Sequence, residues 1–315
     1  MRNNKIDFNK NFKKVLIVYA VIFLAGIVFM FIPGFGVKLD INFSGGTKIA
    51  YSYTGDVKDA DIEAAVKEVI KKSFTVSKST SLTGDTKTFE ISLVGKDSVS
   101  AEDQEKLTTT LEDKFKDNKI ELYNSNSVSP TVAGSFFAKS LVAVLITAVL
   151  VIIYVGIRFK RIGGISAAIT ALCALVFDVF ITFFTCVFFR LQLDSNYIAV
   201  VLTILGYSLN DTIVIYDRVR ENARLMPEAE IGEVVNTSIN TSLRRNIITS
   251  LTTFVAVMTI VTVSELFGLS TLRTFAIPMA FGIVSGAISS LCIAGPLWVI
   301  WRPVSYTHLR AHETK

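Results

Sequence analysis

The sequence predicts an α-helical polytopic membrane protein with six transmembrane helices and an extracytoplasmic α+β domain between the first and second helix. Hydrophobic residues make up 51% of the 315 residues, and the mean hydropathy of +0.50 is too high for an ordinary soluble chain. Six long apolar runs account for this composition, and Lys and Arg residues cluster beside them. Because that placement of the net charge of +5 suits a membrane surface, we expect a lipid bilayer and no nucleic acid as partner.

The first apolar run, Val15–Ile32, follows the polar and basic segment Met1–Lys14. It is about long enough to cross a hydrocarbon core of ~30 Å. It is also longer than the ~7–15-residue core of a cleaved signal peptide, and the segment Phe31–Phe35 is not a small-residue cleavage site. We therefore expect an uncleaved first transmembrane helix within residues 1–33, with a cytoplasmic N-terminus.

Residues 34–133 have the composition of a soluble domain, with frequent charged and hydroxyl residues. Period-two and helical apolar patterns alternate along this stretch and predict a ferredoxin-like βαββαβ domain. Ser100 with Asp103 is a loose capping box for the second helix. No nucleophile–base pair stands out, so we expect a contact surface or a mechanical module. The predicted elements are, in order, Lys48–Tyr53, Lys58–Lys72, Phe74–Leu82, the turn Thr83–Asp85, Thr86–Val94, the helix after Ser100, and Lys119–Val128.

Residues 134–301 contain the other five spans, joined by short basic inner loops and short outer turns. Six crossings place both termini in the cytoplasm, and the positive-inside pattern supports that orientation. The inner segment at 217–246 has apolar residues at helical spacing and predicts an amphipathic helix on the inner surface or against the bundle. We expect the tail at 302–315, which resembles translated adapter sequence, to be non-native. The predicted spans are Phe136–Ile157, Ile162–Phe189, the run from near Tyr197, Ile247–Leu266 and Thr274–Ile300, the last with the small-xxx-small pair Gly282 and Gly286.

Asp211 lies inside the fourth apolar run, below the expected bilayer surface. A carboxylate there costs at least ~2.5–3.5 kcal/mol on insertion scales, so it normally faces a partner, a cavity or a pathway. Thr203, Tyr207 and Asn210 recur with Asp211 at helical spacing and predict one polar stripe on an apolar helix. The alternative is an acid that only hydrogen-bonds a neighbouring helix.

Asp178, near the middle of the third span, is the second candidate acid, and hydroxyl groups on packed helices are an equally good explanation for it. Arg244 and Arg245 precede the fifth span, where their side chains either snorkel outward or reach a carboxylate. The positive-inside rule alone also explains these arginines. The two histidines lie in the last residues and the three cysteines lack metal-like spacing, so we expect no metal site and no enzyme activity.

Three segments resemble motifs of the SecF-type subunits in the SecD/SecF family of bacterial protein-export membrane proteins. Gly206–Asn222 is similar to the family's fourth-helix motif, Leu39–Thr47 to the motif after the first span, and Ser238–Ser250 to the motif that enters the fifth span. The resemblance covers the chain from the first to the sixth span. Asn42 departs from the family pattern, which more often has Asp at this position.

The resemblance implies a subunit related to resistance–nodulation–division transporters, which run on an ion gradient. Such a protein would couple the proton- or sodium-motive force to preprotein export across the bacterial plasma membrane. Its expected partners are SecD, the Sec translocon channel and the unfolded preprotein, with H⁺ or Na⁺ as coupling ion and no other cofactor. The residues assigned by this reading are Asp211, Arg245 and Asp178 for ion coupling, and Tyr207, Ser208 and Asn210 for lining the pathway.

Two alternatives are compatible with the residues alone. One is an ion-gradient-driven exporter of small molecules or lipids that acts as a homodimer, because six spans with one such acid resemble half of a pseudo-symmetric transporter. The other is an inert membrane scaffold, which would tolerate the loss of Asp211.

Overall fold

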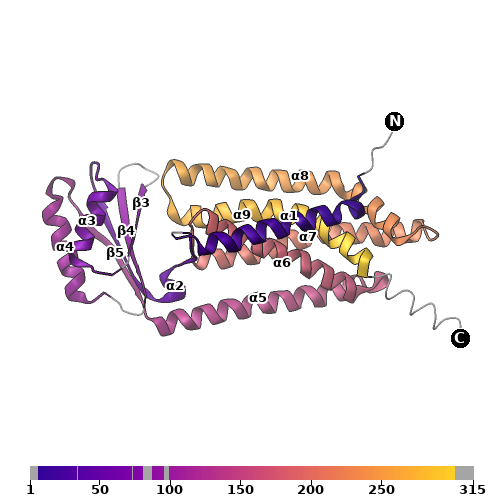
Figure 1. The fold of residues 1–315 in the computed structure, drawn as a ribbon, viewed down its shortest axis with the longest axis horizontal. Helices are drawn as coiled ribbons and strands as arrows, with labels where there is room; N and C mark the ends of the chain where they lie inside the picture. The colour runs from indigo at the N-terminus through magenta and orange to yellow at the C-terminus, as the bar shows by residue number, and fades with distance from the viewer. Residues whose placement is uncertain (1–5, 34, 73, 81–86, 96–98, 302–315) are drawn as a thin grey trace.

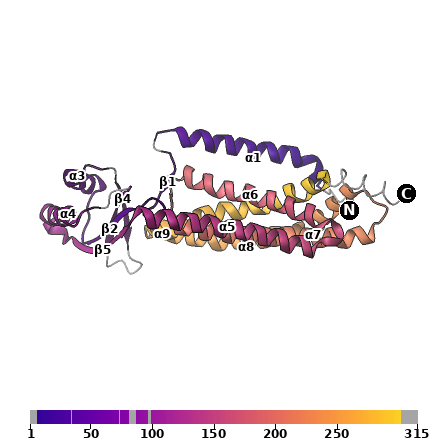
Figure 2. The ribbon, with the colours of Figure 1, turned by 90° about the horizontal axis from the view of Figure 1, so that it is seen from below.

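The protein, a computed structural model, is elongated, with an α+β domain at one end and a bundle of long helices at the other (Figures 1 and 2). The structure describes residues 6–33, 35–72, 74–80, 87–95 and 99–301. The predicted turn at 83–85 and the tail at 302–315 lie outside these residues. The first helix begins, and the last one ends, at the end of the bundle opposite the α+β domain (Figure 1).

The α+β domain has the predicted βαββαβ order. Its four strands form an antiparallel sheet in the order β3-β4-β2-β5, which is the strand order of a ferredoxin-like fold. The Ser100 half of the predicted loose capping box is present, because the Ser100 side chain accepts a hydrogen bond from the Asp103 backbone N–H at 3.1 Å. The elements are β2 (Gly46–Tyr53), α3 (Asp59–Val69), β3 (Thr75–Thr80), β4 (Lys87–Val94), α4 (Ala101–Lys114) and β5 (Glu121–Val128), with a 3₁₀ turn, η1 (Lys116–Asn118), before β5.

One face of this sheet carries the domain core. Ile49 of β2 lies opposite Ile91 of β4, and both are fully buried. Ile62 of α3 and Leu107 and Leu111 of α4 cover them and are also fully buried. The period-two pattern of the strands and the helical period of α3 and α4 therefore meet in one core, as the sequence pattern predicts.

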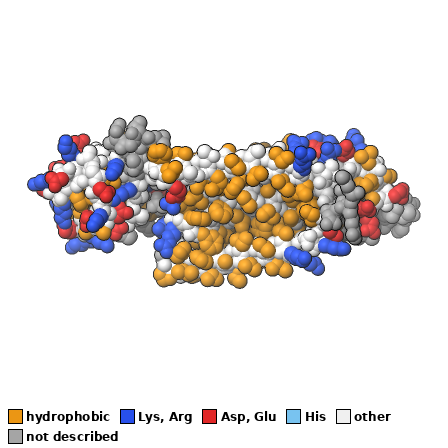
Figure 3. All heavy atoms as spheres, turned by 90° about the horizontal axis from the view of Figure 1, so that it is seen from above, with side chains coloured by type: hydrophobic (Ala, Val, Ile, Leu, Met, Phe, Trp, Pro, Cys, Tyr) orange, Lys and Arg blue, Asp and Glu red, His pale blue; other side chains and the backbone are white. Residues whose placement is uncertain are grey.

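Six helices of the described chain are long and apolar enough to cross a membrane, which confirms the predicted number. Their side chains form an apolar band with charged residues gathered at its two ends (Figure 3). The bounds are α1 (Phe8–Phe31), α5 (Pro130–Arg158), α6 (Gly164–Phe188), α7 (Ser195–Leu225), α8 (Ile231–Leu266) and α9 (Ser270–Ser289), which continues through the π-helical turn η3 (Ser290–Ala294) to Trp301.

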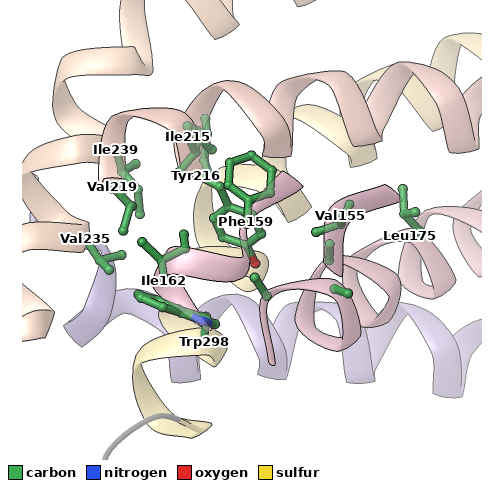
Figure 4. Packing of buried hydrophobic residues seen from close by; sticks show 14 of the residues in the cluster. Val155, Phe159, Ile162, Leu175, Ile215, Tyr216, Val219, Val235, Ile239 and Trp298 are labelled. Atoms are coloured by element: carbon green, nitrogen blue, oxygen red, sulfur yellow. The ribbon is translucent and has the colours of Figure 1, made fainter. Parts of the chain in front are cut away.

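The inner segment at 217–246 is not a separate surface helix. Its first part continues α7 to Leu225, and its second part is the beginning of α8, which runs unbroken into the fifth span. Val235 and Ile239 are buried against the bundle together with Trp298 (Figure 4). The apolar stripe therefore packs against the last turns of the helix that continues α9, which is the second of the two predicted positions, because that end of the bundle extends beyond the apolar spans.

A core at the end of the bundle opposite the α+β domain holds α5, α7 and α9 together (Figure 4). Phe159 and Tyr216 pack edge to face with ring centroids 5.6 Å apart. Trp298 is fully buried, and its indole N–H donates to Ser166 Oγ at 3.1 Å. This satisfied polar atom allows the largest side chain of the core to be fully buried there.

The small-xxx-small face of α9 brings this helix close to α6 and α7. A Cβ atom at Gly282 would lie 2.7 Å from Thr182 Cγ2, and one at Gly286 would lie 3.0 Å from Ser208 Cβ. These separations leave no room for a larger side chain at Gly282 and little at Gly286. As predicted, the two glycines permit close helix contact.

A junction that the sequence did not predict joins the α+β domain to the bundle. The short strand β1 (Lys38–Leu39) pairs in parallel with β6 (Gln192–Leu193), in the turn between α6 and α7. The helical turn α2 (Ile41–Ser44) follows, and Gly45 and Gly46 then take φ values of 78° and 131°. Because such φ values favour glycine, the two glycines explain this part of the Leu39–Thr47 motif.

Candidate ion-coupling site

Two carboxylates lie inside the helix bundle at the level of the apolar band. Asp211 is on α7 and 2% exposed, and Asp178 is on α6 and fully buried. They face different neighbours: Asp211 contacts α8, while Asp178 contacts α7 and α9. The bundle therefore holds two separate acidic sites.

Asp211 is weakly held. Its one hydrogen bond among the described residues comes from Ser250 Oγ of α8, which donates to Oδ2 at 3.3 Å. The same α7–α8 seam contains buried polar atoms without a hydrogen-bond partner in the described chain: Tyr207 Oη, Ser242 Oγ, and Asn246 Oδ1 and Nδ2. Buried polar atoms left unpaired are costly, so a seam with several of them has the chemistry to hold water or a hydrated ion next to Asp211.

Arg245 precedes Ser250 on α8, but no ion pair joins it to Asp211 among the residues that the structure describes. Its side chain is exposed. Ser250, which does contact Asp211, is five positions further along α8, so the two residues point about 140° apart at ~100° per residue. The pairing of Arg245 with Asp211 stays a prediction.

Asp178 is surrounded by three serine hydroxyls. Ser208 Oγ of α7 donates to Oδ2 at 2.6 Å, Ser289 Oγ of α9 donates to the same atom at 2.9 Å, and Ser285 Oγ donates to Oδ1 at 2.6 Å. Tyr19 of α1 extends the network, because its hydroxyl lies 3.1 Å from Ser285 Oγ. We call Asp178, Ser208, Ser285 and Ser289 the serine cradle; it connects α6, α7 and α9, and Tyr19 links α1 to it.

The serine cradle lies beside the point where the last helix changes its hydrogen-bond pattern. Ser290, the first residue of η3, donates to the Ser208 carbonyl at 3.1 Å and accepts from Thr212 Oγ1 at 3.0 Å. At the other end of η3, the Tyr216 hydroxyl donates to the Ala294 carbonyl at 3.4 Å. Single π-helical turns occur mostly inside α-helices at functional sites.

The predicted polar stripe on α7 is not one buried line. Asp211 is buried, but Thr203 and Asn210 are exposed on the outer side of the bundle. The three predicted pathway residues also diverge: Tyr207 lies in the α7–α8 seam, Ser208 belongs to the serine cradle, and Asn210 faces outward. Tyr207 thus lies in the same seam as Asp211, Ser208 binds Asp178, and Asn210 contacts neither acid.

The sequence did not single out Ser250, Asn246 or the two cradle serines of α9. In retrospect, Ser242, Asn246 and Ser250 recur every four residues on α8, and Ser285 and Ser289 do so on α9. Polar residues at helical spacing inside an apolar run were therefore a usable signal. Serine is too common in membrane helices for this signal to identify a partner by itself.

A second polar cluster lies at the junction with the α+β domain. Lys48 Nζ pairs with Asp40 at 3.0 Å and with Glu90 at 2.8 Å, and Asp40 is almost completely buried. Burial lowers the pKa of Lys48, but the hydrogen bonds and charges of Glu90 and Asp40 outweigh burial and raise it overall. Asn42 Nδ2 donates to Asp40 Oδ2 at 2.9 Å, so the amide at this position adds a hydrogen bond that an ionised Asp would lack.

Asp194 caps α7 on the same side of the bundle. It accepts hydrogen bonds from the Tyr197 backbone N–H and from Thr274 Oγ1 at 3.0 Å. Burial raises its pKa despite these bonds. Because Asp40 N–H also donates to the Leu193 carbonyl at 3.0 Å, the domain junction is tied to the first turns of α7 and α9.

Comparison with known proteins decides the family. The family described as protein export membrane protein SecD/SecF, C-terminal, matches residues 107–304. The chain belongs to this family. The SecF subunit of Rickettsia bellii is 32% identical over 304 residues, which cover 95% of this chain and 94% of that protein.

Other members of the SecD/SecF family match a smaller share of their own length. The SecF subunit of Alicyclobacillus acidocaldarius is 40% identical over 179 residues, and the match spans 56% of each chain. The crystal structure of SecDF from Thermus thermophilus, described as a translocon-associated membrane protein, superposes with a TM-score of 0.75 at 27% identity. It covers 96% of this chain and 39% of that one, so the SecDF chain extends well beyond the matched part.

Proposed function

We propose that this membrane protein is a SecF-type accessory subunit of a protein translocase, and that it couples the movement of H⁺ or Na⁺ to preprotein export. The observation that carries the proposal is Asp211, a buried carboxylate in a membrane span with one long hydrogen bond. An acid that is expensive to insert and is not fully paired fits a group that changes its charge state. The named relatives are protein translocase subunits, which favours this function over the small-molecule exporter.

Asp211 is the proposed ion relay. The unpaired polar atoms of Asn246 and Ser242 lie on the α8 face toward α7 and lead from the inner side of the bundle to Ser250 and Asp211. Arrival of a proton would neutralise Asp211. In the proposed cycle Arg245 pairs with the ionised form in a second arrangement of α7 and α8 and is released on protonation.

SecD, the translocon channel and the unfolded preprotein are the proposed partners. Thr203 and Asn210 are exposed on α7 within its apolar span, and Asn210 makes no hydrogen bond to the described residues. An amide facing lipid is costly, whereas the same amide at a helix–helix contact finds partners. This outward polar face supports a second transporter half packed against α7, and the SecDF neighbour has the additional chain length to provide it.

The proposed location is the bacterial plasma membrane, with both termini in the cytoplasm and the α+β domain outside. Basic side chains at the end of the bundle opposite the domain support this orientation, among them Arg158, Lys160 and Arg161. Reporter fusions at Lys87 should read as exterior, and those at Lys160 and Glu228 as cytoplasmic. A cytoplasmic signal at Lys87 would overturn the orientation.

The function is tested with Asp211→Asn, which removes the charge while keeping the size and hydrogen-bonding capacity of the side chain. Gradient-dependent stimulation of preprotein export into inverted vesicles should vanish, although the protein accumulates normally. Arg245→Ala should give a similar loss. Glu233→Gln, which removes an exposed acid at the start of α8, is the control and should export like the wild type. Undiminished gradient stimulation in a well-expressed Asp211→Asn variant returns Asp211 to a packing role.

A further inference from the structure

A basic pocket lies at the end of the bundle opposite the α+β domain. It is about 710 Å³ in volume and is formed by the end of α5, the 3₁₀ turn η2 (Lys160–Ile162) and the last turns of α7. Five of the side chains that line it are cationic. The lining residues are Ile157, Arg158, Lys160, Arg161, Arg220 and Arg224.

One carboxylate holds two of these cations in place. Asp217 Oδ1 lies 3.0 Å from Arg158 Nη2 and 3.0 Å from Arg220 Nη2. The nearby Glu221 is paired with Arg218 at 2.6 Å, and together with Arg220 and Arg224 it lines an adjoining hollow on the same face of α7. The basic pocket is therefore a fixed structure with an excess of positive charge.

The other three cations have no acidic partner among the residues that the structure describes. Lys160, Arg161 and Arg224 are exposed and form no ion pair within the described part of the chain. The positive-inside rule explains why basic residues gather at this end of the bundle. It does not explain why two separate segments, 157–161 and 220–224, converge on one hollow, where like charges repel each other unless an anion lies between them.

An apolar strip leads from the basic pocket into the membrane span. Ile157 lines the pocket and is 74% exposed, and Leu150 and Ile153 are exposed on the same face of α5 at helical spacing. A molecule with an anionic head and long apolar chains matches both surfaces at once. Basic pockets between transmembrane helices on the cytoplasmic side are known to bind the head groups of anionic lipids.

We propose that the basic pocket binds the head group of an anionic phospholipid. Its phosphate lies against Arg161 and Arg224, and its acyl chains run along Ile157, Ile153 and Leu150. An acidic protein segment would use the cations but would leave the adjoining apolar strip of α5 without a role. The site is independent of the ion-coupling function, because neither acid of the bundle touches it.

The test is lipid retention by the purified full-length protein, measured by native mass spectrometry in detergent with added cardiolipin, phosphatidylglycerol or phosphatidylcholine. The wild type should retain the two anionic lipids in preference to the zwitterionic one. Arg161→Gln with Arg224→Gln should weaken cardiolipin binding about 30-fold, which corresponds to ~1 kcal/mol for each cation removed. Lys13→Gln with Lys14→Gln, which removes two exposed cations of α1 outside the pocket, is the charge-matched control and should bind like the wild type.

Equal retention of phosphatidylcholine and the anionic lipids by the wild type overturns the proposal, and this measurement needs no variant. An equal loss in both double variants also overturns it, because the binding would then follow net charge alone. If the pocket variant retains cardiolipin but loses a co-purifying protein, the occupant is an acidic segment and the lipid assignment is wrong. Unchanged thermal unfolding of the variants without added lipid shows that they are folded.

Discussion

The serine cradle allows a quantitative test of the charge state of Asp178. Ser208 and Ser285 lie 2.6 Å from the carboxylate oxygens, which is within the ~2.5–2.7 Å range of O–H hydrogen bonds to an anion. We therefore expect Asp178 to be held as an anion by hydroxyl donors. In that case it acts as a fixed anchor between α6, α7 and α9.

Ser289→Ala is the most direct perturbation, since Ser289 is fully buried and its bond to Asp178 is the least entangled with other side chains. A hydrogen bond to a charged group contributes ~1.5–3 kcal/mol, whereas bonds between neutral side chains in membrane helices average ~0.6 kcal/mol. Ser289→Ala should therefore lower the free energy of unfolding by ~1.5–3 kcal/mol. Ser264→Ala is the matched control, because Ser264 is equally buried but donates only to the Val261 carbonyl of its own helix.

The assay is equilibrium unfolding in mixed micelles titrated with sodium dodecyl sulfate and followed by tryptophan fluorescence. A double-mutant cycle of Ser289→Ala with Asp178→Asn isolates the coupling between the two side chains. A coupling of ~0.6 kcal/mol or less, equal to the neutral average, would refute the anionic anchor and leave Asp178 as a neutral group. That result would favour a role for Asp178 in the proposed ion coupling over a fixed structural role.

Three further predictions concern packing and the α+β domain. Gly282→Ala should lower the free energy of unfolding by ~1–3 kcal/mol in the same assay, because α9 has no room for a methyl group at this position. Gly206→Ala is the control: its Cβ would meet open space, so the free energy of unfolding should stay the same or rise by up to ~1 kcal/mol. Residues 34–133 expressed alone should melt cooperatively, and an unfolded wild-type fragment would show that the domain needs the bundle. Leu111 is fully buried, so Leu111→Ala should lower the free energy of unfolding of this fragment by ~2–5 kcal/mol. Lys48→Met should cost ~1–3 kcal/mol in the same fragment. Because the pKa of Lys48 is raised on folding, the stabilising contribution of Lys48 is complete below the unfolded pKa near 10.5 and is lost as pH rises through the folded pKa. Above that pH the wild-type fragment should therefore lose more free energy of unfolding than the Lys48→Met fragment. Equal losses in the two fragments would contradict the ion pairs.

Much of the fold follows from local pattern. The six spans could be predicted because crossing a hydrocarbon core requires a long apolar helix, a requirement that each segment meets by itself. The βαββαβ order could be predicted because strand and helix periods differ, and Ile49 and Leu111 lie on the faces that those periods indicate. Asp211 could be identified because a carboxylate in an apolar run is conspicuous whatever surrounds it.

Other features depended on contacts between distant segments. The stripe at Val235 and Ile239 predicts an amphipathic helix in any context, but only the position of Trp298 decides that it faces the bundle and not the membrane surface. The β1–β6 pairing joins strands more than 150 residues apart, and two residues per strand are too few for a period to be visible.

The sequence by itself determined the number of spans, the type of the α+β domain and the presence of two acids inside the apolar helices, because these depend on composition and period within one segment. Only the tertiary structure decided what each acid meets. Among the described residues, Asp178 receives hydrogen bonds from three hydroxyls and Asp211 from one, although the helices that carry them are similarly apolar. The physical reason is that helical period fixes which residues share a face, while the rotation and approach of neighbouring helices, permitted by Gly282 and Gly286, fix what that face touches.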